Sequence, residues 1–193
     1  MQKKDNNFPQ VKFVRKPFIL RPERQGVESW LEVLTKLGQS RGNPHWVDSF
    51  VPSMCQKGKA IGVNFEFDTE VGNSMDSLRL LEWCREMKGW EKQAQLSHTL
   101  AVYHFEQKKT VGRHDNLLAA CEEVGISPEE AQSVLSDPTL YRKKVEEGIE
   151  EAHNNGFFSI PVFSFFVNGK LKDTTNGALS VGEYESILRT VCA

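Results

Sequence analysis

Hydrophobic residues are densest between Gly156 and Gly169, in the segment GFFSIPVFSFFVNG. From Val162 to Val167 nearly every residue is β-branched or aromatic, which favours a β-strand. Asn168-Gly169 follows as the commonest two-residue hairpin turn, and Pro161 stands at the entrance of the strand, where its missing N–H is tolerated. A strand that is apolar on both faces is normally covered on both sides, so we expect this strand to be buried.

Helical periodicity dominates the preceding stretch, residues 73–155. Apolar residues recur there at intervals of three and four, as on one face of a helix. The inward positions of successive helices are Met75, Leu78, Leu81, Cys84 and Met87; Leu96, Leu100, Ala101, Tyr103 and Phe105; Leu117, Cys121 and Val124; and Tyr141, Val145, Ile149 and Ala152. Ser127-Pro128-Glu129-Glu130 is a capping box that begins a further helix, and Asn155-Gly156 ends the last one.

The first third of the chain has a mixed pattern. Val11–Arg15 alternates loosely and predicts a strand, and the prolines that follow it, up to Pro22, exclude a helix. Trp30–Leu37 predicts a short amphipathic helix that ends at Gly38. The next segments are expected to be an irregular stretch at 39–52, a brief helix at Met54–Ile61, and either a strand or a covering loop at Val63–Phe67.

The order of these elements predicts the fold class. A helix, a strand led by proline, a hairpin and a final helix form the C-terminal half of a thioredoxin-like layout. We therefore expect an α/β protein whose thioredoxin-like sheet carries a large inserted helical subdomain at about residues 24–155, within a single domain of residues 1–193.

Composition narrows the classes of partner. The chain has 193 residues with a hydrophobic fraction of 39%, a charged fraction of 26% and a net charge of −2, which gives no electrostatic reason to expect nucleic acid or an anionic membrane. The sequence has no run of about 18 apolar residues, and its first ten residues lack the apolar core of a signal peptide. We expect a cytoplasmic protein that binds neither nucleic acid nor membrane.

Candidate catalytic and metal-binding residues are few. Cys55, Cys84, Cys121 and Cys192 lie far apart, so no Cys-x-x-Cys pair forms a redox motif or half a zinc site. His98 and His104 are six residues apart, which places them on different helix faces. No motif for acyl transfer, nucleotide hydrolysis or dinucleotide binding is present. We therefore assign no catalytic residue, no metal and no required cofactor.

Several short motifs occur in a fixed order from about Val14 to Val191. They are Lys16–Leu20, Asn73–Leu80, Ala152–Pro161 leading into Phe163, and Asn176–Ala178. With these motifs the chain resembles the DsbA family of thioredoxin-fold proteins, and specifically its FrnE-like branch. That branch is related to 2-hydroxychromene-2-carboxylate isomerases and kappa-class glutathione transferases.

The resemblance implies a binding site at Ile160 and Pro161. In the family the matching proline is cis and lies against the active site. We therefore expect a cis Ile160–Pro161 bond, with the polar backbone groups of Ile160 free to pair with an extended peptide or with glutathione. The implied partner is a protein or peptide that carries a thiol or disulfide, or glutathione itself.

The chain departs from the family at the nucleophile. Family members begin with a strand and a helix that carry Cys-x-x-Cys or a serine, whereas the residues before Lys16 contain neither cysteine nor serine. We expect an N-terminally truncated scaffold in which the strand at Val162–Val167 lacks one neighbour and has an unpaired edge.

Three functional hypotheses follow. The first is a DsbA/FrnE-like thiol-disulfide oxidoreductase by descent that is inactive as written. The second is a glutathione-dependent isomerase or transferase, and the third is a non-catalytic peptide-binding module.

Overall fold

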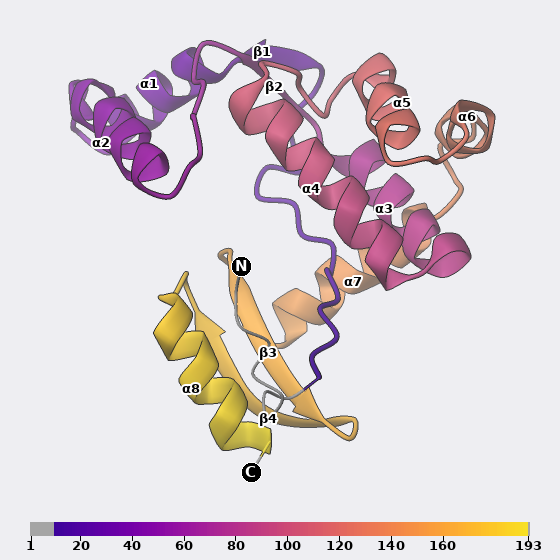
Figure 1. The fold of residues 1–193 in the computed structure, drawn as a ribbon. Coiled ribbons are helices and arrows are strands. Elements are labelled where there is room, and N and C mark those ends of the chain that lie inside the picture. Colours follow the sequence, from indigo (N-terminus) through magenta and orange to yellow (C-terminus); the bar gives the residue numbers. More distant parts are fainter. Residues whose placement is uncertain (1–9, 193) are drawn as a thin grey trace. The chain divides into compact units, whose positions relative to one another are not determined.

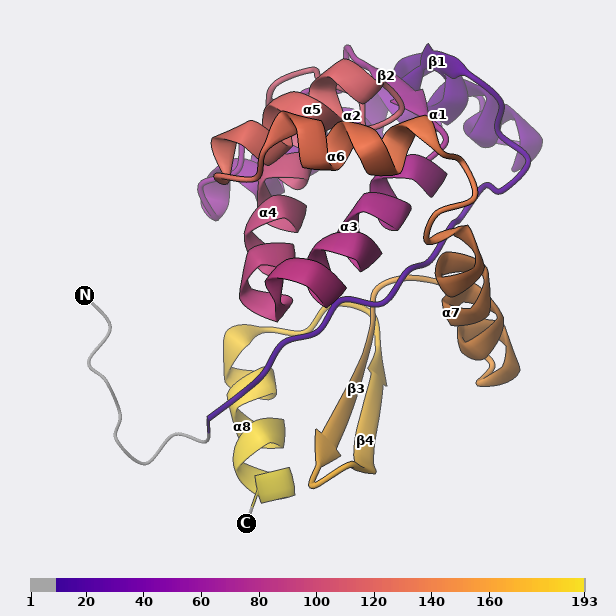
Figure 2. The same cartoon turned by 90° about the vertical axis from the view of Figure 1, so that its right-hand side faces the viewer.

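Two units make up the chain (Figures 1 and 2). The computed structural model describes residues 10–192. Within them, the hairpin unit comprises residues 10–14 and 149–192, and the helical unit comprises residues 15–148. Helix α7 (Arg142–Asn154) contains the boundary between the units. None of the helices formed by residues 10–192 is both long enough and apolar enough to cross a membrane.

The hairpin unit is built on strands β3 (Val162–Val167) and β4 (Lys170–Asn176), which pair antiparallel. Asn168 and Gly169 both have positive φ, 50° and 77°, which is the geometry of the tight turn predicted from Asn-Gly. Helix α8 (Val181–Cys192) packs against both strands (Figure 1). The ring of Phe163 on β3 lies 4.9 Å from that of Tyr184 on α8. The strand, turn and helix predicted for this region are thus confirmed.

The predicted burial of β3 on both faces is wrong. Phe166 on β3 is 62% exposed, and Leu171, its partner in the β4 register, is 57% exposed. The reason is that α8 packs against the hairpin from one side, which leaves apolar side chains on the other side open to solvent.

The strand predicted at Val11–Arg15 is also wrong. Residues 10–19 have no regular secondary structure, and β3 pairs with β4 alone in the part of the chain that the structure describes. An extended segment becomes a strand only through ladder hydrogen bonds, and here side chains hold it instead. The ring of Phe13 lies 6.4 Å from that of Phe163, and the backbone oxygen of Arg15 accepts a hydrogen bond from Gln93 Nε2 at 3.3 Å.

The helical unit has its core among four predicted helices. Periodicity predicted α3 (Met75–Lys88), α4 (Trp90–Glu106) and α5 (His114–Glu123), and a capping box predicted α6 (Pro128–Ser136). Ser127 caps α6 as predicted, because its Oγ accepts hydrogen bonds from the backbone N–H groups of Glu129 and Glu130. Met87 is an exception to the predicted inner face, since it is 60% exposed. Core residues with no exposed surface are Leu80, Cys84, Leu96, Leu117, Ala120, Cys121 and Ala131.

The first part of the helical unit differs most from its prediction. Helix α1 (Trp30–Ser40) continues past Gly38, and α2 (Trp46–Ala60) begins inside the stretch expected to be irregular and contains Pro52. Trp46 stacks on Phe50 one turn later at 4.3 Å, a pairing that supports the start of α2. Val63–Phe67 is a loop, and the short strands β1 (Val27–Ser29) and β2 (Glu70–Gly72) pair beside it without having been predicted.

A close approach of two glycines joins β2 to the loop before α5. A Cβ atom added at Gly112 would lie 2.7 Å from Gly72 Cα. Because Gly72 Cα belongs to the backbone, no side-chain rotation can relieve this steric clash. We expect Gly112→Ala to destabilise the helical unit by about 1–3 kcal/mol in urea unfolding followed by circular dichroism. Gly182→Ala in α8 is the matched control, because nothing lies within 4 Å of its added Cβ. Equal stability of the two variants would contradict this expectation.

Candidate peptide-binding site

The loop from Phe157 to Pro161 leads from α7 into β3 and contains both predicted site residues. Helix α7 ends in a turn in which Gly156 has a φ of 77° and the N–H of Phe157 donates to the carbonyl of Ala152 at 2.9 Å. The Ile160–Pro161 peptide bond that follows is cis. The chain therefore passes from α7 into β3 by way of a turn, a short loop and a proline.

Two hydrogen bonds fix this loop to the end of β4. Ser159 Oγ donates to Asn176 Oδ1 at 3.2 Å, and the N–H of Gly177 donates to the carbonyl oxygen of Pro161 at 2.8 Å. Asn176-Gly177 is one of the motifs on which the family resemblance rests, and its role here is to hold the loop before β3. Ser159 was not identified from the sequence.

Apolar side chains project from the loop into solvent. Ile160 is 52% exposed, and Phe158 is 72% exposed although its ring stacks on that of His153 at 5.5 Å. Single exposed apolar side chains are ordinary, but neighbouring ones that form a contiguous patch mark binding surfaces, and Phe158 and Ile160 lie two residues apart on this loop. Phe158 was not identified from the sequence, because the pattern before the strand does not distinguish an exposed aromatic residue from a buried one.

The start of α8 is fixed close to the same end of the hairpin. The N–H and Oγ of Ser180 both donate to Glu183 Oε2 at 2.7 Å, and these hydrogen bonds lower the pKa of Glu183. The N–H of Leu179 donates to the hydroxyl of Tyr184 at 3.2 Å. The segment after Gly177 is therefore ordered up to the first turn of the helix.

No cysteine lies next to Ile160 and Pro161 in the described residues of the hairpin unit. Its one cysteine is Cys192, the last residue of α8. Helix α8 begins at the end of the hairpin where β3 begins and runs toward the Asn168-Gly169 turn (Figures 1 and 2). A helix of 12 residues spans about 18 Å, so Cys192 lies at the opposite end of the unit from Pro161.

The cysteines of the helical unit have the environment of core residues. Cys84 and Cys121 are fully buried, and burial raises the pKa of the Cys84 thiol to about 11. Burial, with a smaller contribution from Cys84, raises the pKa of the Cys121 thiol to about 12. Cys55 is half-buried, and its Sγ donates to the carbonyl oxygen of Phe65 at 3.6 Å. The burial and raised pKa values of Cys84 and Cys121 are the opposite of the features of a reactive thiolate.

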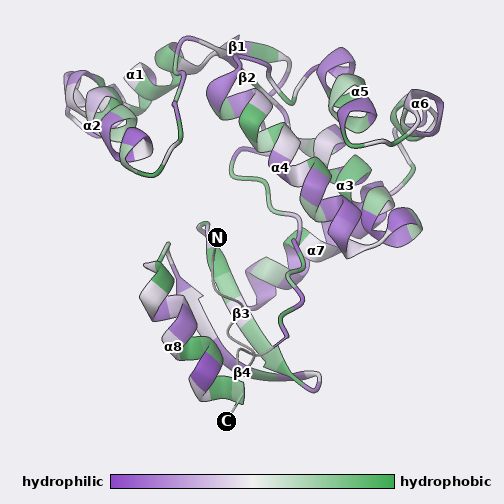
Figure 3. Cartoon of the chain, in the orientation of Figure 1, coloured by the Kyte–Doolittle hydropathy of each residue, from purple (hydrophilic) through white to green (hydrophobic). Residues whose placement is uncertain are grey.

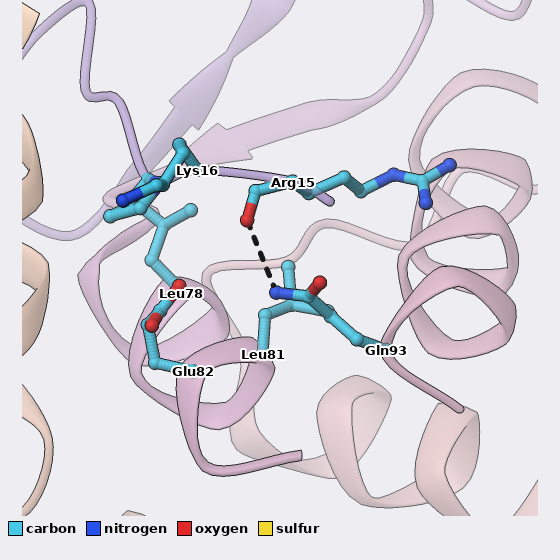
Figure 4. Close-up of a pocket in the computed structure, with 7 residues that line it drawn as sticks. Arg15, Lys16, Leu78, Leu81, Glu82 and Gln93 are labelled. Carbon is cyan, nitrogen blue, oxygen red and sulfur yellow. Dashed lines mark hydrogen bonds between the residues drawn. The ribbon is translucent and has the colours of Figure 1, made fainter. Parts of the chain in front are cut away.

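A small pocket lies in the helical unit between α3, α4 and the segment that begins at Arg15 (Figure 4). Its volume is about 10 Å³, and Gln93 crosses it to donate to the Arg15 carbonyl. Gln93 Oε1 is buried without a partner among residues 10–192. This volume accommodates one water molecule, so the pocket is far too small for glutathione or a peptide.

Metal ligands do not converge in residues 10–192, where no group of three or more histidine, cysteine, aspartate or glutamate residues could hold a metal ion. His104 packs instead between the rings of Trp30 and Phe105, at 4.9 and 4.8 Å. Burial and the nearby charge of Arg24 lower the pKa of His104. This histidine is part of an aromatic cluster that joins α1 to α4.

Comparison with known proteins identifies the family. The sequence profile of the DSBA-like thioredoxin domain matches residues 1–189. The chain belongs to this family. The probable DsbA oxidoreductase SCO1869 from Streptomyces coelicolor has a similar solved structure, with a TM-score of 0.78 and 22% sequence identity over 92% of this chain and 74% of that one. No curated protein sequence matches the chain.

Family membership confirms the predicted fold class. The protein has a DsbA-like thioredoxin fold, and its helical unit and small sheets are consistent with an α/β fold that carries a helical insertion. The DsbA-like domain and the structural neighbour also support a thiol-disulfide oxidoreductase-like family. At 22% identity the neighbour establishes the fold and nothing about the substrate.

Proposed function

We propose that this chain is a FrnE-like member of the family that binds an extended, thiol- or disulfide-bearing polypeptide at Ile160 and Pro161 and does not itself exchange disulfides. The observation that carries the proposal is the exposed apolar loop at the entrance of β3, held by Asn176 and Gly177. The only cysteine in the same unit lies at the unit's other end.

Binding at this loop would combine two kinds of contact. Main-chain groups of an extended peptide pair with exposed backbone, which gives affinity without requiring a particular sequence. Ile160 and Phe158 add apolar area, and complete burial of such a side chain stabilises a complex by about 1.5–3 kcal/mol. The expected ligand is therefore an unfolded segment with apolar side chains.

Peptide binding is the direct test. We expect a fluorescently labelled insulin B chain, with its thiols alkylated, to bind the full chain in fluorescence anisotropy. Ile160→Asp should weaken this binding by about tenfold, because it replaces an apolar contact with a charge. Leu171→Asp is the matched control, since Leu171 is similarly exposed, at 57% against 52%, and lies beside the hairpin turn. Equal losses for both variants would refute a site at Ile160.

Catalysis is tested separately. Disulfide exchange requires an attacking thiolate with a suitable pKa and access to the substrate sulfur. We expect the purified chain to reduce insulin no faster than an equal concentration of free thiol. Insulin reduction that is faster than with free thiol, and that a single cysteine-to-serine change abolishes, would overturn this part of the proposal.

The glutathione-dependent alternative predicts a different result in the same binding assay. Reduced glutathione at millimolar concentration should leave the insulin B chain bound if the loop binds polypeptide alone. Displacement of the peptide by glutathione, together with retention of the chain on a glutathione matrix, would favour the isomerase or transferase hypothesis.

A further inference from the structure

Asparagine followed by glycine occurs three times in the chain, at Asn155-Gly156, Asn168-Gly169 and Asn176-Gly177. In such a pair the backbone nitrogen of glycine can attack Cγ of the asparagine side chain and close a succinimide ring, because glycine has no Cβ atom that hinders the approach. The reaction needs a backbone N–H and a side-chain amide that are both free to move. The sequence gives the three pairs the same chemistry, so their surroundings decide which of them reacts.

Hydrogen bonds fix the first pair, at the end of α7. Asn155 Nδ2 donates to the carbonyl oxygen of Glu151 at 2.7 Å. The N–H of Gly156 donates to the carbonyl oxygen of His153 at 2.9 Å. The two groups that would have to meet are therefore held by other partners, and ring closure would first have to break two hydrogen bonds.

The third pair is fixed in the same way, at the end of β4. Asn176 Oδ1 accepts a hydrogen bond from Ser159 Oγ at 3.2 Å. The N–H of Gly177 donates to the carbonyl oxygen of Pro161 at 2.8 Å. These are the hydrogen bonds that hold the loop before β3, so ring closure at Asn176 would also have to release that loop.

The second pair forms the turn between β3 and β4 and is open. Neither the Asn168 side chain nor the N–H of Gly169 has a hydrogen-bond partner within residues 10–192. Both residues are exposed, and a Cβ atom added at Gly169 would meet nothing within 4 Å. Strand β3 is hydrophobic along most of its length (Figure 3), whereas the turn that ends it is polar. Rotation of the Asn168 backbone toward ring closure therefore disturbs only the last pair of the ladder, Val167 and Lys170.

We propose that Asn168 is a site of spontaneous deamidation. The nitrogen of Gly169 loses its proton and bonds to Asn168 Cγ, the bond from Cγ to Nδ2 breaks, and the amide leaves as ammonia. Water then opens the succinimide at either of its carbonyl groups and leaves aspartate or isoaspartate. The reaction requires no oxidant, no reductant and no enzyme.

Both products change the hairpin. Each adds a negative charge close to Lys170. Isoaspartate also routes the main chain through Cβ, which lengthens a turn whose geometry depends on two residues with positive φ. The modification lies at the opposite end of β3 from Ile160, so the proposal does not depend on peptide binding there.

Peptide mapping of the full chain measures the three rates together. After incubation at pH 8 and 37 °C, digestion with trypsin and chymotrypsin separates the three asparagines, because cleavage sites at Phe158, Phe166 and Lys170 lie between them. Mass spectrometry then detects the conversion of amide to acid at each position. In the folded chain we expect Asn168 to be converted about tenfold faster, or more, than the other two asparagines. Tenfold in rate corresponds to about 1.4 kcal/mol of barrier, the size of one or two hydrogen bonds.

The chain unfolded in guanidinium chloride is the control, because unfolding removes the hydrogen bonds and leaves the sequence unchanged. There the three rates should become similar. Equal rates in the folded chain, or faster conversion of Asn155 or Asn176, would overturn the proposal. So would an Asn168 that stays unmodified in the folded chain while all three asparagines react in the unfolded one. If Asn168 kept the same advantage after unfolding, the selection would come from the sequence and the structural argument would fail.

Discussion

At pH 8, alkylation of Cys84 and Cys121 should be at least about a hundredfold slower in the folded chain than in the unfolded chain. The thiolate is the reactive form, and each thiol titrates tenfold per pH unit. Raising the pKa from its ordinary 9.0 to about 11 at Cys84 reduces the thiolate about a hundredfold, and a pKa of about 12 at Cys121 reduces it about a thousandfold. Both sulfurs are also inaccessible, which slows the reaction further.

Mass spectrometry after pulse labelling with iodoacetamide measures this difference residue by residue. Cys192 is exposed and provides the internal control, because it should react in folded and unfolded chains alike. The rate of labelling of Cys84 in the folded chain should rise as the pH approaches about 11, because the thiolate forms there. Rapid labelling of Cys84 or Cys121 at pH 8 in the folded chain would show a reactive thiol and remove the main support for an inactive chain.

Periodicity predicted the part of the fold that has a continuous core. Helices α3 to α5 repeat apolar residues over two or more turns, α6 begins with a capping box, and the Asn168-Gly169 turn has a strong local preference, so their sequences suffice to place them. Strands β1 and β2 have three residues each, too few for any alternation to be visible. Pro52 concealed the start of α2, because a proline inside a helix is usually excluded.

Tertiary context decided the remaining differences. A loose alternation at Val11–Arg15 becomes a strand only where its backbone joins a hydrogen-bonded ladder, and no strand of the described residues pairs with it. Ile160 and Pro161 came from the family resemblance, whereas the exposure of Phe158 and the hydrogen bond from Ser159 to Asn176, 17 residues later, required coordinates. Local pattern therefore located the strand of the site but not the loop contacts that shape it.

Arg79 is the most buried charge among the described residues of the helical unit. It has no exposed surface, and its guanidinium donates to Asp76 Oδ1 at 2.8 Å. It also donates to three backbone carbonyls: that of Val134 in the last turn of α6 at 2.6 Å, and those of Asp137 and, at 2.8 Å, Leu140 in the segment between α6 and α7. One side chain of α3 thus satisfies the carbonyl groups of a segment about 60 residues away in the sequence, which a lysine with its single nitrogen could not do.

Replacing Arg79 with methionine should therefore lower the free energy of unfolding by about 3–5 kcal/mol, because the carbonyls and the carboxylate lose a buried cationic partner. Urea unfolding followed by circular dichroism measures the loss. Arg113→Met is the matched control, since Arg113 is half-exposed where it pairs with Glu70, and such a pair contributes about 0–1 kcal/mol. Similar stabilities for the two variants would contradict the structural role of Arg79.

Measuring the free energy of unfolding of both proteins at decreasing pH separates the ionic role of Arg79 from a simple loss of packing. Burial raises the pKa of Asp76, but hydrogen bonds from His114 and Arg79 outweigh it, so the pKa lies below its ordinary value. A carboxyl with a lowered folded pKa stabilises the protein above its unfolded pKa, and this contribution is lost as the pH falls through the folded value. The parent chain should therefore lose stability in acid more steeply than Arg79→Met, in which only His114 still donates to Asp76. If the free energies of unfolding of the two proteins fell equally as the pH decreased, Arg79 would act on the fold through its volume alone.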